Sequence, residues 1–116
     1  GYIPPETWRK HRWQPQGDIF SLGVVFFQLM TARVPRSGSD KVQGIFQEGA
    51  KNVTEVGQNT VQKQPPWHLF PTNMRLLTEL VSAMLRKDPE QRPRALQALQ
   101  FGWFFSNTDQ EMPKET

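Results

Sequence analysis

The sequence predicts an all-α fold, and three observations support this prediction. The first is a run of mostly large apolar residues, Ile19 to Met30, which directly follows Asp18. The second is the spacing of apolar residues between Met74 and Leu85, which matches one face of an α-helix. The third is that signals for β-strands are nearly absent. We therefore expect helices packed around a buried central helix at about residues 18–30.

The central helix is expected to begin at Asp18. Its carboxylate can accept hydrogen bonds from the first free N–H groups and lies at the positive end of the helix dipole. A helix with apolar residues on every face is a buried helix, and this run is shorter than the about 20 residues that span a bilayer. A buried strand is the alternative, but the length and the cap favour a helix. Gly23 is interpreted as a point of close backbone contact.

A short helix is expected before the central one. Pro5 suits the first helical position, and the helix should run to about Arg9. The basic residues 9–12 are interpreted as a solvated loop, and residues 13–17 as a linker.

After the central helix, residues 31–39 contain proline and glycine and are expected to form a loop. Ser39 or Asp40 can cap a short helix that ends at about Gly49. Its apolar face would hold Val42, Ile45 and Phe46.

Residues 50–64 are polar and are interpreted as a flexible insertion with at most weak helix, which the prolines at 65 and 66 end. We expect Trp67, Leu69 and Phe70 to return to the core.

The last third of the chain should hold two helices. The first follows a cap at residues 71–73 and runs to about Arg86. Its broad apolar face consists of Met74, Leu77, Leu80, Val81, Met84 and Leu85. After a turn at residues 88–93, the second begins near Pro93. The side chains expected to face inward there are Leu96, Leu99, Phe101, Trp103, Phe104 and Phe105, and the polar tail 106–116 should be frayed.

Length and composition exclude several kinds of protein. The 116 residues form one domain or part of one, with 14 basic and 11 acidic side chains. This excess is mild for a protein that binds nucleic acid. Without cysteine there are no disulfides or thiolate metal sites, and His11 and His68 lack the spaced partners of a metal site. No signal peptide or membrane segment opens the chain, so we expect an intracellular, cytoplasmic protein without membrane or nucleic-acid partners.

The sequence holds no motif that forms an active site by itself. A glycine-rich dinucleotide loop, a P-loop, a zinc-binding H-E-x-x-H and a G-x-S-x-G nucleophile elbow are all missing. The chain also starts at Gly1 without an initiator methionine, as a piece of a larger protein would. The chain is therefore expected to support an active site rather than to contain one.

Four segments, in order, resemble the second half of a protein kinase catalytic domain. Tyr2-Ile3-Pro4-Pro5-Glu6 resembles the A-P-E end of the activation segment. Residues 18–24 resemble D-x-W-S-L-G-V at the start of the central helix of the large lobe. Residues 88–93 resemble the D-P-x-x-R-P turn, and residues 99–104 the closing L-x-H-P-W-F. The resemblance implies a partial kinase domain at residues 1–105, the helical lower half of the large lobe.

The departures from the family pattern are modest. Pro4 replaces the alanine of A-P-E, Phe20 stands where tryptophan is commoner, and Phe101-Gly102 replaces His-Pro. The polar insertion at residues 50–64 is also longer than most. Gly1-Tyr2 and Ser21-Leu22 are more similar to serine/threonine kinases than to tyrosine kinases.

The resemblance implies that the parent protein transfers the γ-phosphate of ATP to serine or threonine with Mg²⁺. The catalytic loop, the metal-binding D-F-G, the glycine-rich loop and the ATP-pairing lysine would all lie upstream. No catalytic, cofactor-binding or metal-binding residue is therefore assigned here. The expected partners are the upstream kinase segment and a protein substrate.

The resemblance gives structural roles to a few residues. Glu6 and Arg92 would form a buried ion pair that ties the activation segment to the turn before the last helix; otherwise they are unrelated surface charges. The Asp18 carboxylate would also bind N–H groups of the catalytic loop. Tyr2 and Ile3 would line the groove for the residue after the phosphoacceptor, or else belong to the core.

Two other functions stay open at this stage. The parent could be a pseudokinase, in which case the segment is a binding scaffold without chemistry, and the sequence upstream of Gly1 would decide. More remotely, the chain could be a basic helical module that binds nucleic acid, which a steep salt dependence of binding would reveal.

Overall fold

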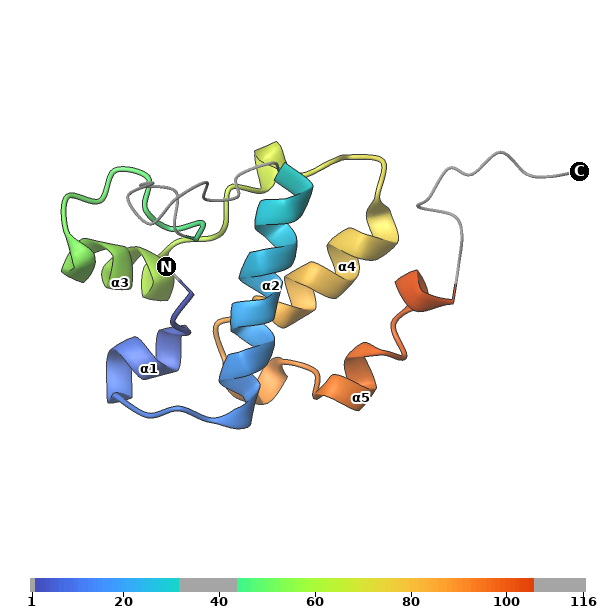
Figure 1. The fold of residues 1–116 in the computed structure, drawn as a ribbon, viewed down its shortest axis with the longest axis horizontal. Helices are drawn as coiled ribbons and strands as arrows, with labels where there is room; N and C mark the ends of the chain where they lie inside the picture. The colour runs from blue at the N-terminus through green and yellow to red at the C-terminus, as the bar shows by residue number, and fades with distance from the viewer. Residues whose placement is uncertain (1, 32–43, 106–116) are drawn as a thin grey trace, which may run out of the picture.

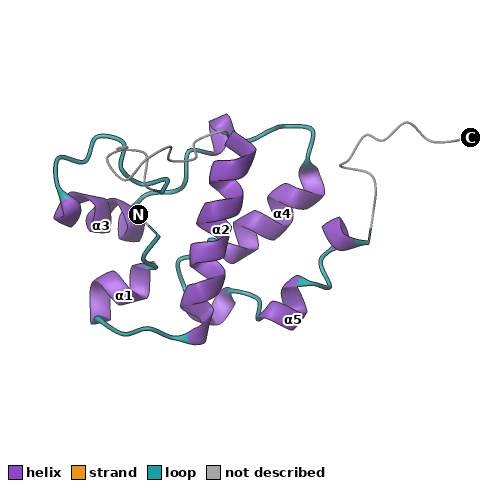
Figure 2. Ribbon diagram, viewed as in Figure 1, coloured by secondary structure: helices purple, strands orange, loops and turns teal. Residues whose placement is uncertain are grey.

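The structure is a computed structural model that describes residues 2–31 and 44–105. In these two ranges all regular structure is helical, so the predicted all-α fold is confirmed (Figure 2). The α-helices are α1 (Pro5–Lys10), α2 (Pro15–Thr31), α3 (Val53–Gln62), α4 (Arg75–Met84) and α5 (Ala95–Ala98). Three short 3₁₀ helices are η1 (Trp67–Leu69), η2 (Pro89–Gln91) and η3 (Gly102–Phe104).

Helix α2 runs through the middle of the molecule (Figure 1). Helices α1 and α3 lie together on one side of it, and α4 and α5 lie on the other. Among the described residues, no helix is long and apolar enough to cross a membrane. The expected central helix is therefore the element that separates the two halves of the fold.

The core forms where α2 packs against α4. Phe20, Val24 and Phe27 of α2 are fully buried. The apolar face predicted for α4 is buried in the same core except for Met74, which is only partly buried. Gly23 allows this packing, because a Cβ atom added there would lie 3.0 Å from Cβ of Met84 and 3.0 Å from Cδ2 of Leu85. The close contact predicted at this glycine is thus present.

The start of α2 differs from the prediction. The helix begins at Pro15, so Asp18 lies inside the first turn and does not cap the helix. A proline is tolerated at a helix start because its missing N–H would have no partner inside the helix. The Asp18 side chain is exposed to solvent.

Helix α2 is also not buried on every face in the described structure. Leu22, Val25 and Leu29 are 43%, 39% and 58% exposed. Together with Asp18, which starts the same helix face, they form a line that we call the exposed α2 stripe. Burial of the whole helix would need a further neighbour.

Residues 53–62 correct the interpretation of a flexible insertion, because they form the regular helix α3. Asn52 caps it: its side-chain oxygen accepts a hydrogen bond from the Glu55 N–H at 2.9 Å. The buried positions of α3 are Gly57 and Thr60. Neither is a large apolar residue, so hydrophobic periodicity could not identify this buried face.

The short helix predicted at 40–49 is not formed in its described part. Residues 44–49 make bends and a turn, and Gly44 and Gly49 have φ angles of 101° and 78°, which no right-handed helix accommodates. Ile45 and Phe46 are nevertheless buried. Val42 and the rest of this prediction lie outside the described residues.

The C-terminal region buries less than predicted. Leu96, Leu99, Phe104 and Phe105 are 76%, 52%, 42% and 76% exposed. Because α5 is little more than one turn long, it turns only Ala98 into the core. Trp67 and Phe70 pack onto Phe27 as predicted, whereas Leu69 is 41% exposed. The predicted tail at 106–116 lies outside the described residues.

Candidate functional site

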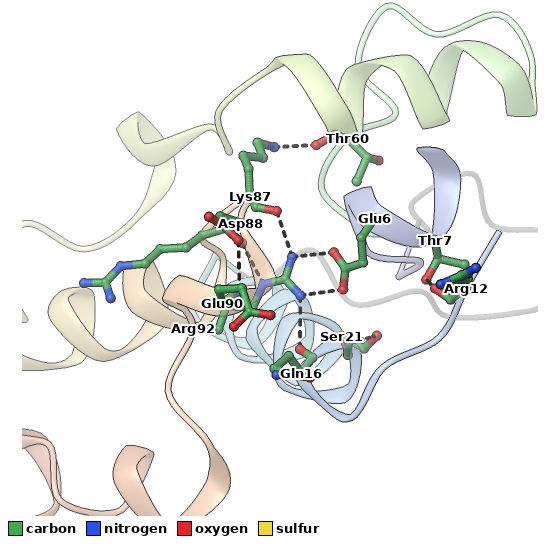
Figure 3. Close-up of polar contacts among 12 residues, drawn as sticks. Glu6, Thr7, Arg12, Gln16, Ser21, Thr60, Lys87, Asp88, Glu90 and Arg92 are labelled. Atoms are coloured by element: carbon green, nitrogen blue, oxygen red, sulfur yellow. Dashed lines mark hydrogen bonds and ion pairs between the residues drawn. The ribbon is translucent and has the colours of Figure 1, made fainter. Parts of the chain in front are cut away.

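Glu6 and Arg92 form the ion pair expected from the sequence (Figure 3). The two nitrogens Nη1 and Nη2 of Arg92 donate to Oε2 and Oε1 of Glu6 at 2.8 and 2.7 Å. Glu6 is 7% and Arg92 is 4% exposed. This is the two-pronged geometry that a planar guanidinium makes with a carboxylate. Residues that lie 86 positions apart are thereby joined in the interior.

Arg92 uses all five N–H donors of its guanidinium. Nε donates to the carbonyl oxygen of Arg86 at 2.6 Å, Nη1 to that of Gln16 at 3.1 Å and Nη2 to that of Lys87 at 3.2 Å. The guanidinium carbon also lies 4.9 Å from the centre of the Phe20 ring. One side chain therefore ties α1, the start of α2 and the end of α4 together.

The segment before α1 is held against α2. The Ser21 hydroxyl donates to the carbonyl oxygen of Tyr2 at 2.7 Å, and it lies 3.1 Å from the carbonyl oxygen of Gly17. Tyr2 is half-buried against the core, whereas Ile3 is 36% exposed. Pro4 is fully buried, so the chain between Tyr2 and α1 has a fixed path.

Asp18 is not part of this cluster. In the described ranges its carboxylate has no hydrogen-bond or ion-pair partner, and it faces solvent at the start of the exposed α2 stripe. The two histidines are also separate: His11 ends α1 with a φ angle of 56°, and His68 is exposed in η1.

Lys87 belongs to the site, although no motif or pattern in the sequence around it indicates this. Its ammonium donates to the carbonyl oxygen of Thr60 in α3 and lies 4.3 Å from the centre of the Phe46 ring. Burial, and secondarily the nearby positive charge of Arg92, lower the pKa of Lys87 from 10.5 to about 8. Only the folded chain brings Thr60 to this lysine, so no local pattern could have identified the contact.

The arrangement fixes the segment before α1 and the turn at η2 relative to α2. Glu6 and Arg92 satisfy each other, and Arg92 is fixed by carbonyl oxygens. Among the described residues, no group of three or more His, Cys, Asp or Glu side chains is placed to hold a metal ion. The chemistry of this cluster is therefore structural.

Comparison with known proteins agrees with this geometry. The model of the protein kinase domain matches residues 1–104. Calcium-dependent protein kinase 34 of Arabidopsis thaliana is 33% identical over 102 residues, which cover 88% of this chain and 17% of the relative. The brassinosteroid LRR receptor kinase BRI1 of Oryza sativa subsp. japonica is 29% identical over 107 residues, which cover 85% of this chain and 9% of the relative.

A bacterial relative shows the same relationship. The serine/threonine-protein kinase drp72 of Corynebacterium efficiens is 29% identical over 109 residues, which cover 87% of this chain and 18% of the relative. The chain thus spans only a small part of the length of each of these relatives. Because the protein kinase domain model matches residues 1–104, nearly all of the described chain, the chain belongs to the protein kinase domain family.

Proposed function

We propose that this chain is the substrate-side scaffold of a serine/threonine protein kinase. The parent protein would transfer the γ-phosphate of ATP, bound with Mg²⁺, to a serine or threonine hydroxyl of a protein. The groups that bind ATP and Mg²⁺ and that remove the hydroxyl proton would come from other segments of the parent. This chain would hold the protein substrate next to them.

The observation that carries the proposal is the buried Glu6–Arg92 pair. A buried charge is costly unless it is paired and hydrogen-bonded, so this pair holds α1 firmly to η2 and α2. Tyr2 and Ile3 lie just before Pro4, the residue that precedes α1, and Ser21 holds the backbone at Tyr2. A fixed backbone beside a partly exposed apolar side chain suits a surface that receives an extended peptide.

The exposed α2 stripe supports the second part of the proposal, that another segment of the kinase domain completes the core. Leu22, Val25 and Leu29 present apolar surface along one helix face, and Asp18 adds a carboxylate at its start. The complementary neighbour would bring apolar side chains to the stripe and backbone N–H groups to the carboxylate. We assign this position to the upstream kinase segment rather than to nucleic acid or a membrane.

A phosphotransfer assay on the whole protein tests the function. The protein is incubated with Mg²⁺ and γ-labelled ATP and with a positional library of serine, threonine and tyrosine peptides. We expect labelled serine or threonine from the whole protein, and none from residues 1–116 alone. Exclusive labelling of tyrosine would refute the serine/threonine assignment.

The pseudokinase alternative predicts a different result in the same assay. The whole protein would then label no peptide, while the chain would keep the same fold. Titration calorimetry with Mg²⁺ and ATP on residues 1–116 alone provides the control, and micromolar binding there would contradict the proposal that the nucleotide site lies elsewhere.

A further inference from the structure

Helix α3 packs directly on α1, although the sequence indicates only a polar insertion there. The contact between these two helices places α3 beside the first helix of the chain (Figure 1). Gly57 and Thr60, which are three positions apart and so share a helix face, are the buried residues of α3. The polar insertion is therefore part of the packed structure on the side of α1.

The contact depends on a glycine facing a tryptophan. A Cβ atom added at Gly57 would lie 2.5 Å from Cε3, 2.7 Å from Cδ2 and 2.9 Å from Cζ3 of Trp8. All three atoms belong to a rigid ring, so the indole cannot relieve the clash by bending. A side chain at position 57 must therefore turn the Trp8 ring or displace α1 or α3.

The other end of α3 is connected to the Glu6–Arg92 pair. The Lys87 ammonium donates a hydrogen bond to the carbonyl oxygen of Thr60 in α3 (Figure 3). The carbonyl oxygen of Lys87 in turn accepts a hydrogen bond from Nη2 of Arg92. Arg92 in turn binds Glu6 on α1. The contacts thus form a closed ring from α1 through η2 and α3 back to Trp8 on α1.

Movement of α1 would reach the segment before it. The N–H groups of Thr7 and Trp8 donate to the carbonyl oxygen of Pro4 at 3.1 and 3.3 Å. Pro4 and Pro5 have fixed φ angles, so the chain between Tyr2 and Trp8 has little freedom to absorb a shift. A shift of Trp8 would therefore act on the same short segment that Ser21 holds at Tyr2.

We propose that Gly57 and Trp8 are positioning residues for the protein substrate: their contact places α1, and with it the Tyr2–Ile3 segment that faces the peptide. This inference rests on the proposed function and adds a determinant of substrate binding to it. The determinant is helix α3, which lies between α2 and η1 along the chain, and not a residue that touches the substrate.

The test is steady-state kinetics of the whole protein carrying Gly57→Ala. The peptide is the best-phosphorylated member of a positional serine/threonine library. We expect the KM for this peptide to rise about three- to tenfold, because small misplacements of a substrate-positioning element are costly in enzymes. The KM for ATP should stay unchanged, and the library should show an altered preference at the residue after the phosphoacceptor.

Three further variants make the result specific. Gly102→Ala is the matched control, since its Cβ would meet Leu76 at an ordinary 3.4 Å, and its kinetics should equal those of the unaltered protein. Trp8→Leu removes the ring that Gly57 faces, and it should raise the peptide KM as Gly57→Ala does because both changes disturb the same contact. If Gly57→Ala does not fold, Lys87→Met replaces it, because this change releases α3 without a clash and should raise the same KM.

The kinetic results distinguish substrate positioning from general destabilisation and from failure of the proposed function. An unchanged peptide KM in a folded Gly57→Ala protein would overturn the inference. Parallel losses in peptide KM, ATP KM and melting temperature would also overturn it, because they indicate general destabilisation. Absence of any phosphorylation by the unaltered protein would instead overturn the proposed function, and this inference with it.

Discussion

Removal of Arg92 should destabilise the protein strongly, and the contacts of its side chain allow an estimate. In Arg92→Ala the Glu6 carboxylate, which is 7% exposed, stays in the interior without its partner. Breaking a buried ion pair in this way typically costs about 3–5 kcal/mol. The carbonyl oxygens of Arg86, Gln16 and Lys87 also lose their donor, at about 1 kcal/mol or more each where water does not reach them.

The two partners should not be equivalent. In Glu6→Ala the guanidinium keeps its hydrogen bonds to the three carbonyl oxygens, so part of its charge remains solvated by the protein. We therefore expect Arg92→Ala to lower the free energy of unfolding by about 6 kcal/mol or more and Glu6→Ala by about 3 kcal/mol. The double variant should cost less than the sum of the two, because neither charge is then left alone.

The assay is urea unfolding of the whole protein, followed by tryptophan fluorescence. Arg75→Ala is the matched control: its pair with Glu79 measures 3.3 Å, but the side chains are 73% and 54% exposed. An exposed pair of this kind contributes less than about 1 kcal/mol. If Arg92→Ala costs no more than Arg75→Ala, or if the single changes add up to the double, the reasoning from burial is wrong.

Three further predictions follow from other contacts. Gly23→Val should lower the free energy of unfolding by about 1–3 kcal/mol through overpacking against Met84, measured by urea unfolding; a neutral result, equal to Gly102→Ala, would contradict it. The folded state lowers the pKa of Lys87 from 10.5 to about 8, so unfolding takes up a proton at pH values between these two. The free energy of unfolding should therefore rise with pH over this range, and this gain should be lost as the pH falls through 8. Lys87→Met should flatten this rise, and an unaltered slope would disprove the assignment. Residues 1–116 alone should self-associate through the exposed α2 stripe, and a monomer with a sharp, reversible thermal transition would argue against it.

The sequence by itself determined the elements whose pattern is local. The apolar run after Asp18 and the periodic face of residues 74–85 were sufficient to predict α2 and α4, because helix period and side-chain type are properties of neighbouring residues. The order of the matched segments also predicted the family. Boundaries were less certain: α2 begins at Pro15, since backbone hydrogen bonds rather than a capping side chain decide where it starts.

Only the tertiary structure decided how the remaining elements lie. Helix α3 buries Gly57 and Thr60, which carry no hydrophobic signal, and its position depends on a tryptophan in another helix. Lys87 reaches a carbonyl oxygen 27 positions away, and the one-turn α5 leaves Leu96 and Leu99 exposed. The pairing of Glu6 with Arg92 was predictable only through the family resemblance, because no local rule favours Glu6 over the carboxylates of Asp88 and Glu90, which are nearer to Arg92 in the sequence. Burial and close approach depend on which surfaces meet after folding, and a pattern of neighbouring residues does not contain that information.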